Sequence, residues 1–211
     1  MGGGFLLNDK FLELPEEKQN SILNAAMNVF AKYEYKKATT DEIVTKAGIS
    51  KGLLFYYFES KKGLYLYLYK FAEHFLIAEM RKDYDQTETD FFAMLINAQN
   101  IKVKIMKQYS DLFGFLMKAY LEKDSAVQTD MNCQFKDIIT SSCALVLQRA
   151  DLSKFKESVS PKKVLDLIIL LSDGIMRNRA TEPIDNLYAI NDEYLIYLDM
   201  MKQNFYKEEY L

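Results

Sequence analysis

The sequence predicts an all-α protein, and three observations carry that prediction. The chain has 211 residues but only 8 glycines and 3 prolines, and Gly2, Gly3 and Gly4 are adjacent near its start. A β-sandwich or barrel needs a turn signal roughly every 8–12 residues, which so few glycines and prolines cannot supply. Apolar residues recur at helical spacing from Pro15 onward. With 49% hydrophobic residues, the chain is also long enough to bury a sizeable core.

The first clear helix begins at Pro15. Proline at the start of a helix loses no hydrogen bond, and the acids Glu16 and Glu17 suit the positive end of the helix dipole. One face of this helix then carries Ile22, Ala26, Val29, Phe30 and Tyr33. The polar stretch 34–38 breaks the helical period, so we expect a turn there.

Two short helices follow within residues 39–58. Thr39-Thr40-Asp41-Glu42 forms a Thr-x-x-Glu capping box, which marks a helix start. Gly48 ends that helix after about two turns, because glycine readily adopts the left-handed conformation of a helix C-terminus. Ser50 is then the predicted N-cap of the next helix.

The rest of the chain continues the helical pattern. A long helix begins after Ser60 and reaches about Arg81, and the polar stretch 83–89 predicts a loop. Pro161 opens a later helix, and Pro183 marks the break that follows it. About nine helices are expected in all, with the later ones at about 90–108, 110–122, 126–150, 161–180 and 191–206.

Charge and composition exclude several functions. The net charge of −3 is not that of a basic coat for nucleic acid, although residues 32–62 hold seven lysines and four acids. Cys133 and Cys143 match no zinc pattern or disulfide framework, and we expect both to be small core residues. His74, the single histidine, is expected to pack in an apolar helix and not to bind metal. No signal peptide or membrane span is evident, which predicts a cytoplasmic protein, associated with the nucleoid when bound to DNA. No metal or cofactor is expected.

The two short helices have the organisation of a helix-turn-helix. In the second helix, Leu54 and Phe58 are four residues apart and are expected to face the core. The remaining positions of that helix are then expected to lie wholly or partly outward: Lys51, Gly52, Leu53, Phe55, Tyr56 and Tyr57. Any helical hairpin can show a helix–glycine–helix pattern. Together with the caps, the local lysines and the outward tyrosines, it favours DNA binding.

Residues 18–70 resemble the N-terminal region of TetR-type transcriptional regulators. The resemblance rests on Ala38-Thr39-Thr40-Asp41-Glu42-Ile43, Ala47-Gly48-Ile49-Ser50-Lys51-Gly52, Leu54-Phe55-Tyr56-Tyr57-Phe58 and Ser60-Lys61. It extends upstream through Ile22, Ala25, Ala26, Phe30 and the turn at Tyr33–Tyr35. The remainder of the chain is similar only in length and helix count.

The resemblance implies roles for individual residues. Side chains that would contact phosphates are Thr40, Tyr56, Tyr57 and Lys61, and Thr39 is also expected to bind DNA. Side chains that would lie in or beside the major groove are Lys51, Gly52, Leu53 and Phe55, with Ser50 as the cap that orients the helix. Position 53 is commonly threonine and position 55 often tyrosine in the family. Leu53 and Phe55 lack those hydroxyls, so DNA shape is expected to carry much of the specificity.

The resemblance also implies a division of labour, with a DNA-binding domain at residues 1–62 and an effector-binding and dimerisation domain at 63–211. Aromatic and methionine residues of the middle helices are either ordinary core or an effector pocket. The residues alone favour core, whereas the resemblance favours a pocket. The pocket candidates are Phe91, Phe113, Met117 and Tyr120. The long helix from Ser60 to about Arg81 would then transmit a ligand-induced shift to the recognition helix.

The helices at 161–180 and 191–206 have broad apolar faces, which predicts a four-helix interface between two subunits. The expected interface residues are Leu167, Leu171, Gly174, Leu195 and Leu198. Gly174 would allow close helix approach, or else mark a local kink near the helix end.

The resulting hypothesis is a homodimeric, ligand-responsive regulator. It would be a repressor that a small apolar or aromatic effector releases from a near-palindromic double-stranded operator. The competing hypotheses are a helical protein-interaction adaptor, and a helical enzyme or small-molecule carrier with an incidental helix-turn-helix. Against an enzyme, the sequence has no paired carboxylates at ligand spacing, no nucleophile–histidine–acid set and no phosphate-binding glycine loop.

Overall fold

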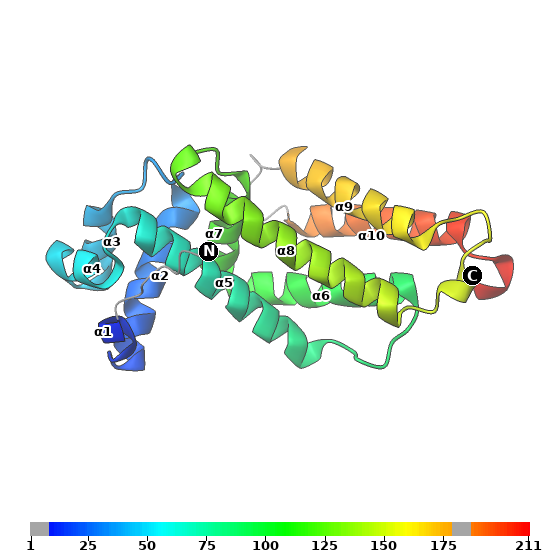
Figure 1. Ribbon diagram of the computed structural model, residues 1–211, viewed down its shortest axis with the longest axis horizontal. Helices are drawn as coiled ribbons and strands as arrows, with labels where there is room; N and C mark the ends of the chain where they lie inside the picture. Colours follow the sequence, from blue (N-terminus) through cyan, green and yellow to red (C-terminus); the bar gives the residue numbers. More distant parts are fainter. Residues whose placement is uncertain (1–8, 179–186) are drawn as a thin grey trace. The chain divides into compact units, whose positions relative to one another are not determined.

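The computed structural model describes residues 9–178 and 187–211, with the side chains of 132–137 and 187–189 outside the description. The described part of the chain forms helices joined by loops, with one isolated β-bridge between Phe155 and Tyr206 (Figure 1). Its helices are α1 (Asp9–Leu12), α2 (Glu16–Lys32), α3 (Thr40–Ala47), α4 (Lys51–Phe58), α5 (Lys61–Asp83), α6 (Phe91–Gln108), α7 (Ser110–Leu121), α8 (Ser125–Arg149), α9 (Pro161–Asn178) and α10 (Leu187–Phe205), with short 3-10 helices at Leu152–Lys154 and Glu208–Tyr210. This confirms the predicted fold class.

The α-helix missing from the sequence prediction is α1, a single turn before Pro15. Its Phe11 is completely buried and contacts the rings of Tyr57, Phe58 and Tyr67 at centroid distances of 5.7, 4.9 and 5.6 Å. One turn is too short to show a period in sequence. Its existence depends on the apolar surface of α4 and α5 that receives Phe11.

The chain divides into two compact units, one of residues 1–78 and 108–134, the other of residues 79–107 and 135–211. It passes from one unit to the other within α5, at the end of α6 and within α8. The predicted boundary at residue 62 is a functional division between DNA binding and regulation. It stays a prediction.

The first unit is built around α2, α5 and α7. Phe30 of α2, Tyr65 of α5 and Phe115 of α7 are all fully or almost fully buried, with ring centroids 4.8 to 6.0 Å apart. Aromatic pairs in tilted or edge-to-face contact at this separation add to the stabilisation from burial. Therefore α7, far along the chain, belongs to the same core as the helix-turn-helix.

The second unit has its own core. Phe91 and Phe92 at the start of α6 contact Phe155 and Tyr206, with centroids 5.2 and 5.1 Å apart for Phe91–Phe155 and Phe92–Tyr206. The backbone joins the same segments, because Lys156 N–H donates to the Phe205 carbonyl and Lys207 N–H to the Lys154 carbonyl, each at 3.0 Å. This aromatic cluster closes one end of the unit, and α9 and α10 lie side by side in it.

His74 is exposed on α5, so its predicted packing in an apolar helix was wrong. Cys143 is a free, half-buried thiol that packs against the second core, and burial raises its pKa. Cys133 lies outside the described side chains.

Candidate DNA-binding surface

The predicted caps define both helices of the helix-turn-helix. The Thr39 side chain accepts a hydrogen bond of 3.3 Å from the Glu42 N–H, and the Ser50 side chain accepts one of 3.2 Å from the Leu53 N–H. Between them, Gly48 has φ of 66°, the left-handed conformation that ends α3. Each cap satisfies an N–H that has no partner within its helix, and the caps thereby set the start and direction of α3 and α4.

One face of α4 is buried and the other is open. Leu54 is completely buried and Phe58 nearly so, whereas Lys51 and Gly52 are exposed. Lys51 reaches back to α3, where its ammonium lies 2.9 Å from the Asp41 carboxylate. Because both side chains are well exposed, this ion pair contributes little stability. Lys51 therefore remains available to bind another anion.

Gly52 and Gly63 have different surroundings. A Cβ built on Gly52 would meet no atom within 4 Å, so no neighbour in the protein requires glycine there. A Cβ on Gly63 would lie 2.1 Å from the carbonyl oxygen of Phe58. Gly63 therefore serves the fold, whereas the open space at Gly52 leaves room for something outside the chain.

The tyrosines of α4 separate into one outward and one inward residue. Tyr56 is 54% exposed, as expected for a residue that contacts a partner. Tyr57 is only 6% exposed because its ring packs on Phe11, so the expectation that it lies outward was wrong. Leu53 and Phe55 are half-buried on the flanks of α4. The sequence could not show the position of Tyr57, because α1 creates its environment.

Thr39 and Thr40 divide in the same way. Thr39 is exposed, while Thr40, the first residue of α3, is 9% exposed and is one of the few buried polar side chains of the described chain. The Thr40 side chain is therefore largely inaccessible to a partner. As the first residue of α3, Thr40 lies at the positive end of the helix dipole, which attracts anions.

Lys61 is held by the protein itself. Its ammonium donates to the carbonyls of Ala38 at 2.9 Å and Lys36 at 3.4 Å, and it lies 4.5 Å from the centre of the Tyr35 ring. Burial lowers the pKa of this ammonium. These interactions commit Lys61 to the turn between α2 and α3, whereas the family resemblance implied only a phosphate contact for it.

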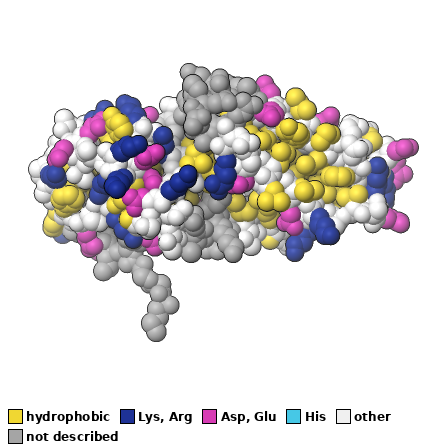
Figure 2. Space-filling model, turned by 90° about the horizontal axis from the view of Figure 1, so that it is seen from above, with side chains coloured by type: hydrophobic (Ala, Val, Ile, Leu, Met, Phe, Trp, Pro, Cys, Tyr) yellow, Lys and Arg dark blue, Asp and Glu magenta, His cyan; other side chains and the backbone are white. Residues whose placement is uncertain are grey.

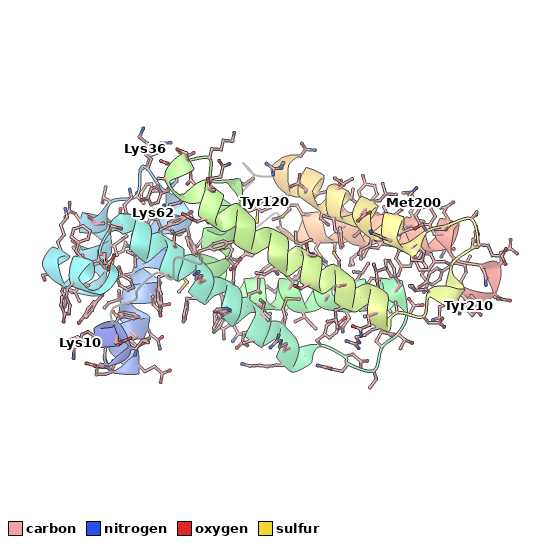
Figure 3. All side chains as sticks on the ribbon, in the orientation of Figure 1. Lys10, Lys36, Lys62, Tyr120, Met200 and Tyr210 are labelled. Atoms are coloured by element: carbon pink, nitrogen blue, oxygen red, sulfur yellow. The ribbon has the colours of Figure 1, made fainter. Side chains whose placement is uncertain are left out.

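The sequence prediction omitted three further lysines near the caps. Lys36 and Lys37 lie in the α2–α3 turn and Lys46 near the end of α3, all exposed. Lys37 pairs with Glu34 at 3.0 Å, while Lys36 projects outward from the turn (Figure 3). The sequence did show seven lysines in residues 32–62, but their number alone did not indicate which of them are exposed beside the caps.

The predicted pocket residues occur in both units. Phe91 is completely buried in the second core, and Phe113 is buried on α7 of the first unit. Met117 and Tyr120 are half-buried on α7. The same unit also contains Glu73 of α5, which interacts with Tyr69 through a side-chain hydrogen bond but has a buried carboxylate oxygen without a partner in the structure. Burial raises the pKa of Glu73.

The predicted interface residues differ in exposure. Leu167 is exposed, and Leu171, Gly174 and Leu195 are half-buried. Leu198 is completely buried in the second core, so it is not an interface side chain as predicted. The sequence prediction also omitted the more exposed apolar residues of these helices, namely Leu170, Ile196 and Met200.

The part of the chain that the structure describes contains no helix long and apolar enough to cross a bilayer. Within the same residues, no group of three or more histidine, cysteine, aspartate or glutamate side chains could hold a metal ion.

Comparison with known proteins gives concordant results. Residues 22–68 match the family model described as bacterial regulatory proteins, tetR family. The regulator RutR of Escherichia coli O157:H7 is 23% identical over 131 residues, and the activator FasR of Mycolicibacterium smegmatis is 28% identical over 131 residues. Each match covers 61% of this chain, but only 60% of RutR and 56% of FasR.

Solved structures share the fold over nearly the whole chain. A TetR-family regulator from Chloroflexus aurantiacus aligns with a TM-score of 0.62 and 20% identity, covering 95% of this chain and 99% of that one. A putative TetR-family regulator from Rhodococcus sp. aligns with a TM-score of 0.71 and 13% identity, covering 89% and 100%. At these identities the structural likeness speaks for the fold, while the family model identifies the helix-turn-helix. Together they show that residues 22–68 match the DNA-binding segment of the tetR family of bacterial regulatory proteins, and that the chain has the fold of TetR-family regulators.

Proposed function

We propose that this chain is a homodimeric repressor that binds a near-palindromic operator through α3 and α4 and is released by a small molecule. The observation that carries DNA binding is the open face of α4. Its N-terminus is capped and exposed, Lys51 and Tyr56 lie on the surface, and Gly52 faces free space. A helix N-terminus, an ammonium group and a phenol hydroxyl all suit phosphate oxygens, and the absent side chain permits close approach to a groove. Such a protein would act on DNA in the cytoplasm.

The structure refines which side chains are expected to bind DNA. Lys51 would exchange the exposed Asp41 carboxylate for a phosphate, at little cost. Tyr56 and the exposed Thr39 remain phosphate candidates, whereas the ring of Tyr57 is occupied by core packing. Leu53 and Phe55 would offer apolar surface beside the groove. We therefore retain the proposal that DNA shape contributes much of the specificity.

The proposal of a dimer is supported by exposed leucines, isoleucine and methionine on α9 and α10. Leu170 and Ile196 are each 68% exposed, and hydrophobic side chains gather on this part of the surface (Figure 2). Contiguous exposed apolar surface of this kind is typical of subunit interfaces. A two-fold dimer would present two copies of α4 roughly 34–36 Å apart, or a multiple of that, to matching half-sites.

The proposal of an effector is supported by the aromatic and methionine side chains of α7 and by Glu73. Apolar surface would supply most of the affinity, and the unpartnered oxygen of Glu73 would favour a ligand with one hydrogen-bond donor. A bound ligand would act by shifting α5, which enters the regulatory region directly from the DNA-binding helices. It can release DNA only to the extent that it prefers the released state, typically about 1–3 kcal/mol of coupling. FasR is a transcriptional activator, so repression is the part of the proposal that a promoter assay must decide.

The experiment is selection of bound sequences from random duplex DNA, followed by binding measurements on the enriched site at several salt concentrations. We expect a near-palindromic site, and Lys51→Ala should weaken binding and reduce the salt slope by about 0.9, the value for one phosphate that the protein no longer neutralises. Lys163→Ala removes the same charge from exposed α9 and should leave binding unchanged. Absence of any enriched or salt-sensitive duplex would favour the adaptor or carrier hypothesis.

A further inference from the structure

The carboxylate of Glu122 joins two loops that are far apart in sequence. Glu122 is the residue directly after α7. One of its oxygens, Oε1, accepts hydrogen bonds of 2.9 Å from the N–H groups of both Lys123 and Asp124, which form the start of the α7–α8 loop. The other oxygen, Oε2, accepts a 2.8 Å hydrogen bond from the N–H of Tyr35 in the α2–α3 turn. A single half-buried side chain therefore satisfies three backbone donors from two segments.

Lys61 also holds the α2–α3 turn. The Lys61 ammonium binds the carbonyls of Ala38 and Lys36. The Tyr35 ring contacts both that ammonium and the Tyr65 ring, whose centre is 5.0 Å away. The turn's own backbone bonds, from Lys37 and Ala38 N–H to the Glu34 carbonyl, are both 3.0 Å long. Glu122 and Lys61 thus hold this short connection through its backbone groups.

This connection leads directly into the proposed phosphate-binding end of α3. Thr39 is the N-cap of α3 and follows Ala38, whose carbonyl Lys61 holds. Lys36 projects from the same turn. Because hydrogen bonds to ionised groups are stronger than those between neutral groups, the two charged side chains limit the positions that Thr39 and Lys36 can take. Neither Glu122 nor Lys61 needs to touch DNA to have this effect.

We infer that Glu122 is a positioning residue for DNA binding: it ties the α7–α8 loop to the α2–α3 turn and so holds the N-terminus of α3 where phosphates bind. The inference rests on the proposed function. It also provides a route for regulation, because a ligand against Phe113, Met117 or Tyr120 would displace α7, the helix that Glu122 directly follows. A ligand-induced shift would then reach the DNA-binding helices through α7 and Glu122 as well as through α5.

The decisive variant is Glu122→Gln. Glutamine keeps the size of the side chain but has a single acceptor oxygen, so it can serve the α7–α8 loop or Tyr35, but not both. Removal of a negative charge close to a DNA-binding surface would by electrostatics alone strengthen DNA binding. The positioning role predicts the opposite sign. We expect operator affinity to fall by about threefold to tenfold, and the salt slope to fall by about 0.9 for each phosphate that the displaced turn no longer neutralises.

Glu34→Gln is the matched control. It removes the same charge from the same turn, but Glu34 is an exposed carboxylate whose described ion pair is with the equally exposed Lys37. Its operator affinity should be unchanged or higher. Equal behaviour of Glu122→Gln and Glu34→Gln would overturn the positioning role and reduce Glu122 to a general charge effect.

Hydrogen exchange in the DNA-free protein tests the same inference without any operator. Glu122→Gln should lose protection at Tyr35 and over the first turn of α3, while α4 and α5 keep theirs. Unchanged protection at Tyr35 would overturn the inference even if DNA binding is altered. If the parent protein binds no DNA, the exchange result still decides whether Glu122 holds the turn, whereas the proposed function fails on its own.

Discussion

At the residue scale, two glycines offer a paired test, Gly52 within α4 and Gly63 near the start of α5. Gly63→Ala should destabilise the protein by about 1–3 kcal/mol, because its Cβ would lie 2.1 Å from a backbone oxygen that cannot move aside without disturbing α4. Gly52→Ala should leave the stability unchanged or raise it by up to about 1 kcal/mol, since alanine is the better helix former and meets no neighbour. Thermal or denaturant unfolding measures both changes.

Operator affinity should respond to Gly52→Ala although stability does not fall. Gly52→Ala places a methyl group on the open face of α4, so operator affinity should fall although the fold is sound. If Gly52→Ala binds the selected operator as tightly as the parent does, the backbone at Gly52 does not approach the groove.

A second test at this scale uses Asp90, which precedes α6 and is 2.9 Å from the Lys154 ammonium. Burial alone would raise its pKa, but hydrogen bonds from Lys154 and the Ala93 N–H, together with the charge of Lys202, outweigh it and lower the pKa. A lowered folded-state pKa stabilises the protein above the ordinary value of about 3.9, and this contribution is lost as the pH falls through the folded pKa. Asp90→Asn should therefore lose about 1–3 kcal/mol near neutral pH. Its stability should also change less than the parent's below about pH 4, as urea unfolding at several pH values would report. An equal acid dependence in both proteins would contradict this.

At the element scale, the connection between α4 and α5 is under backbone strain. Glu59 has φ of 62° and ψ of −42°, and the Ser60 N–H donates to the Phe58 carbonyl at 2.6 Å, which is the geometry of the rarer, strained γ-turn. Glu59→Gly should raise stability by up to about 1 kcal/mol, because glycine adopts positive φ without steric cost. Glu59→Ala keeps the strain and serves as the control, and its unfolding midpoint should stay at or below that of the parent. Equal midpoints for the glycine and alanine variants would mean that the turn stores no strain.

At the scale of the whole molecule, the exposed and buried leucines of the second unit separate assembly from folding. Leu170→Glu on α9 should yield helical monomers of near-parental stability, because Leu170 is 68% exposed within one chain. Leu198→Ala on α10 should remain a dimer but lose about 2–5 kcal/mol, because that side chain is completely buried. Sedimentation velocity and thermal unfolding distinguish the two results. A dimeric Leu170→Glu protein would place the subunit interface elsewhere.

Much of the helix-turn-helix was predictable because its determinants are local. Thr39, Gly48 and Ser50 act on backbone groups within three or four residues of themselves, and the structure has all three in the predicted roles. The burial of Leu54 and Phe58 follows from their spacing on one helix. The bounds of the later helices follow from the same kind of local signal, to within a few residues.

The sequence by itself determined the fold class, the helix starts and stops, and the family resemblance of the DNA-binding segment. Tertiary structure alone decided that Tyr57 turns inward onto Phe11, that Leu198 is core, and that Lys61 and Glu122 both bind backbone groups of one turn. The physical reason is range. A cap or a helical period depends on neighbours along the chain, whereas burial and a backbone hydrogen bond across 87 residues depend on which distant segment packs there.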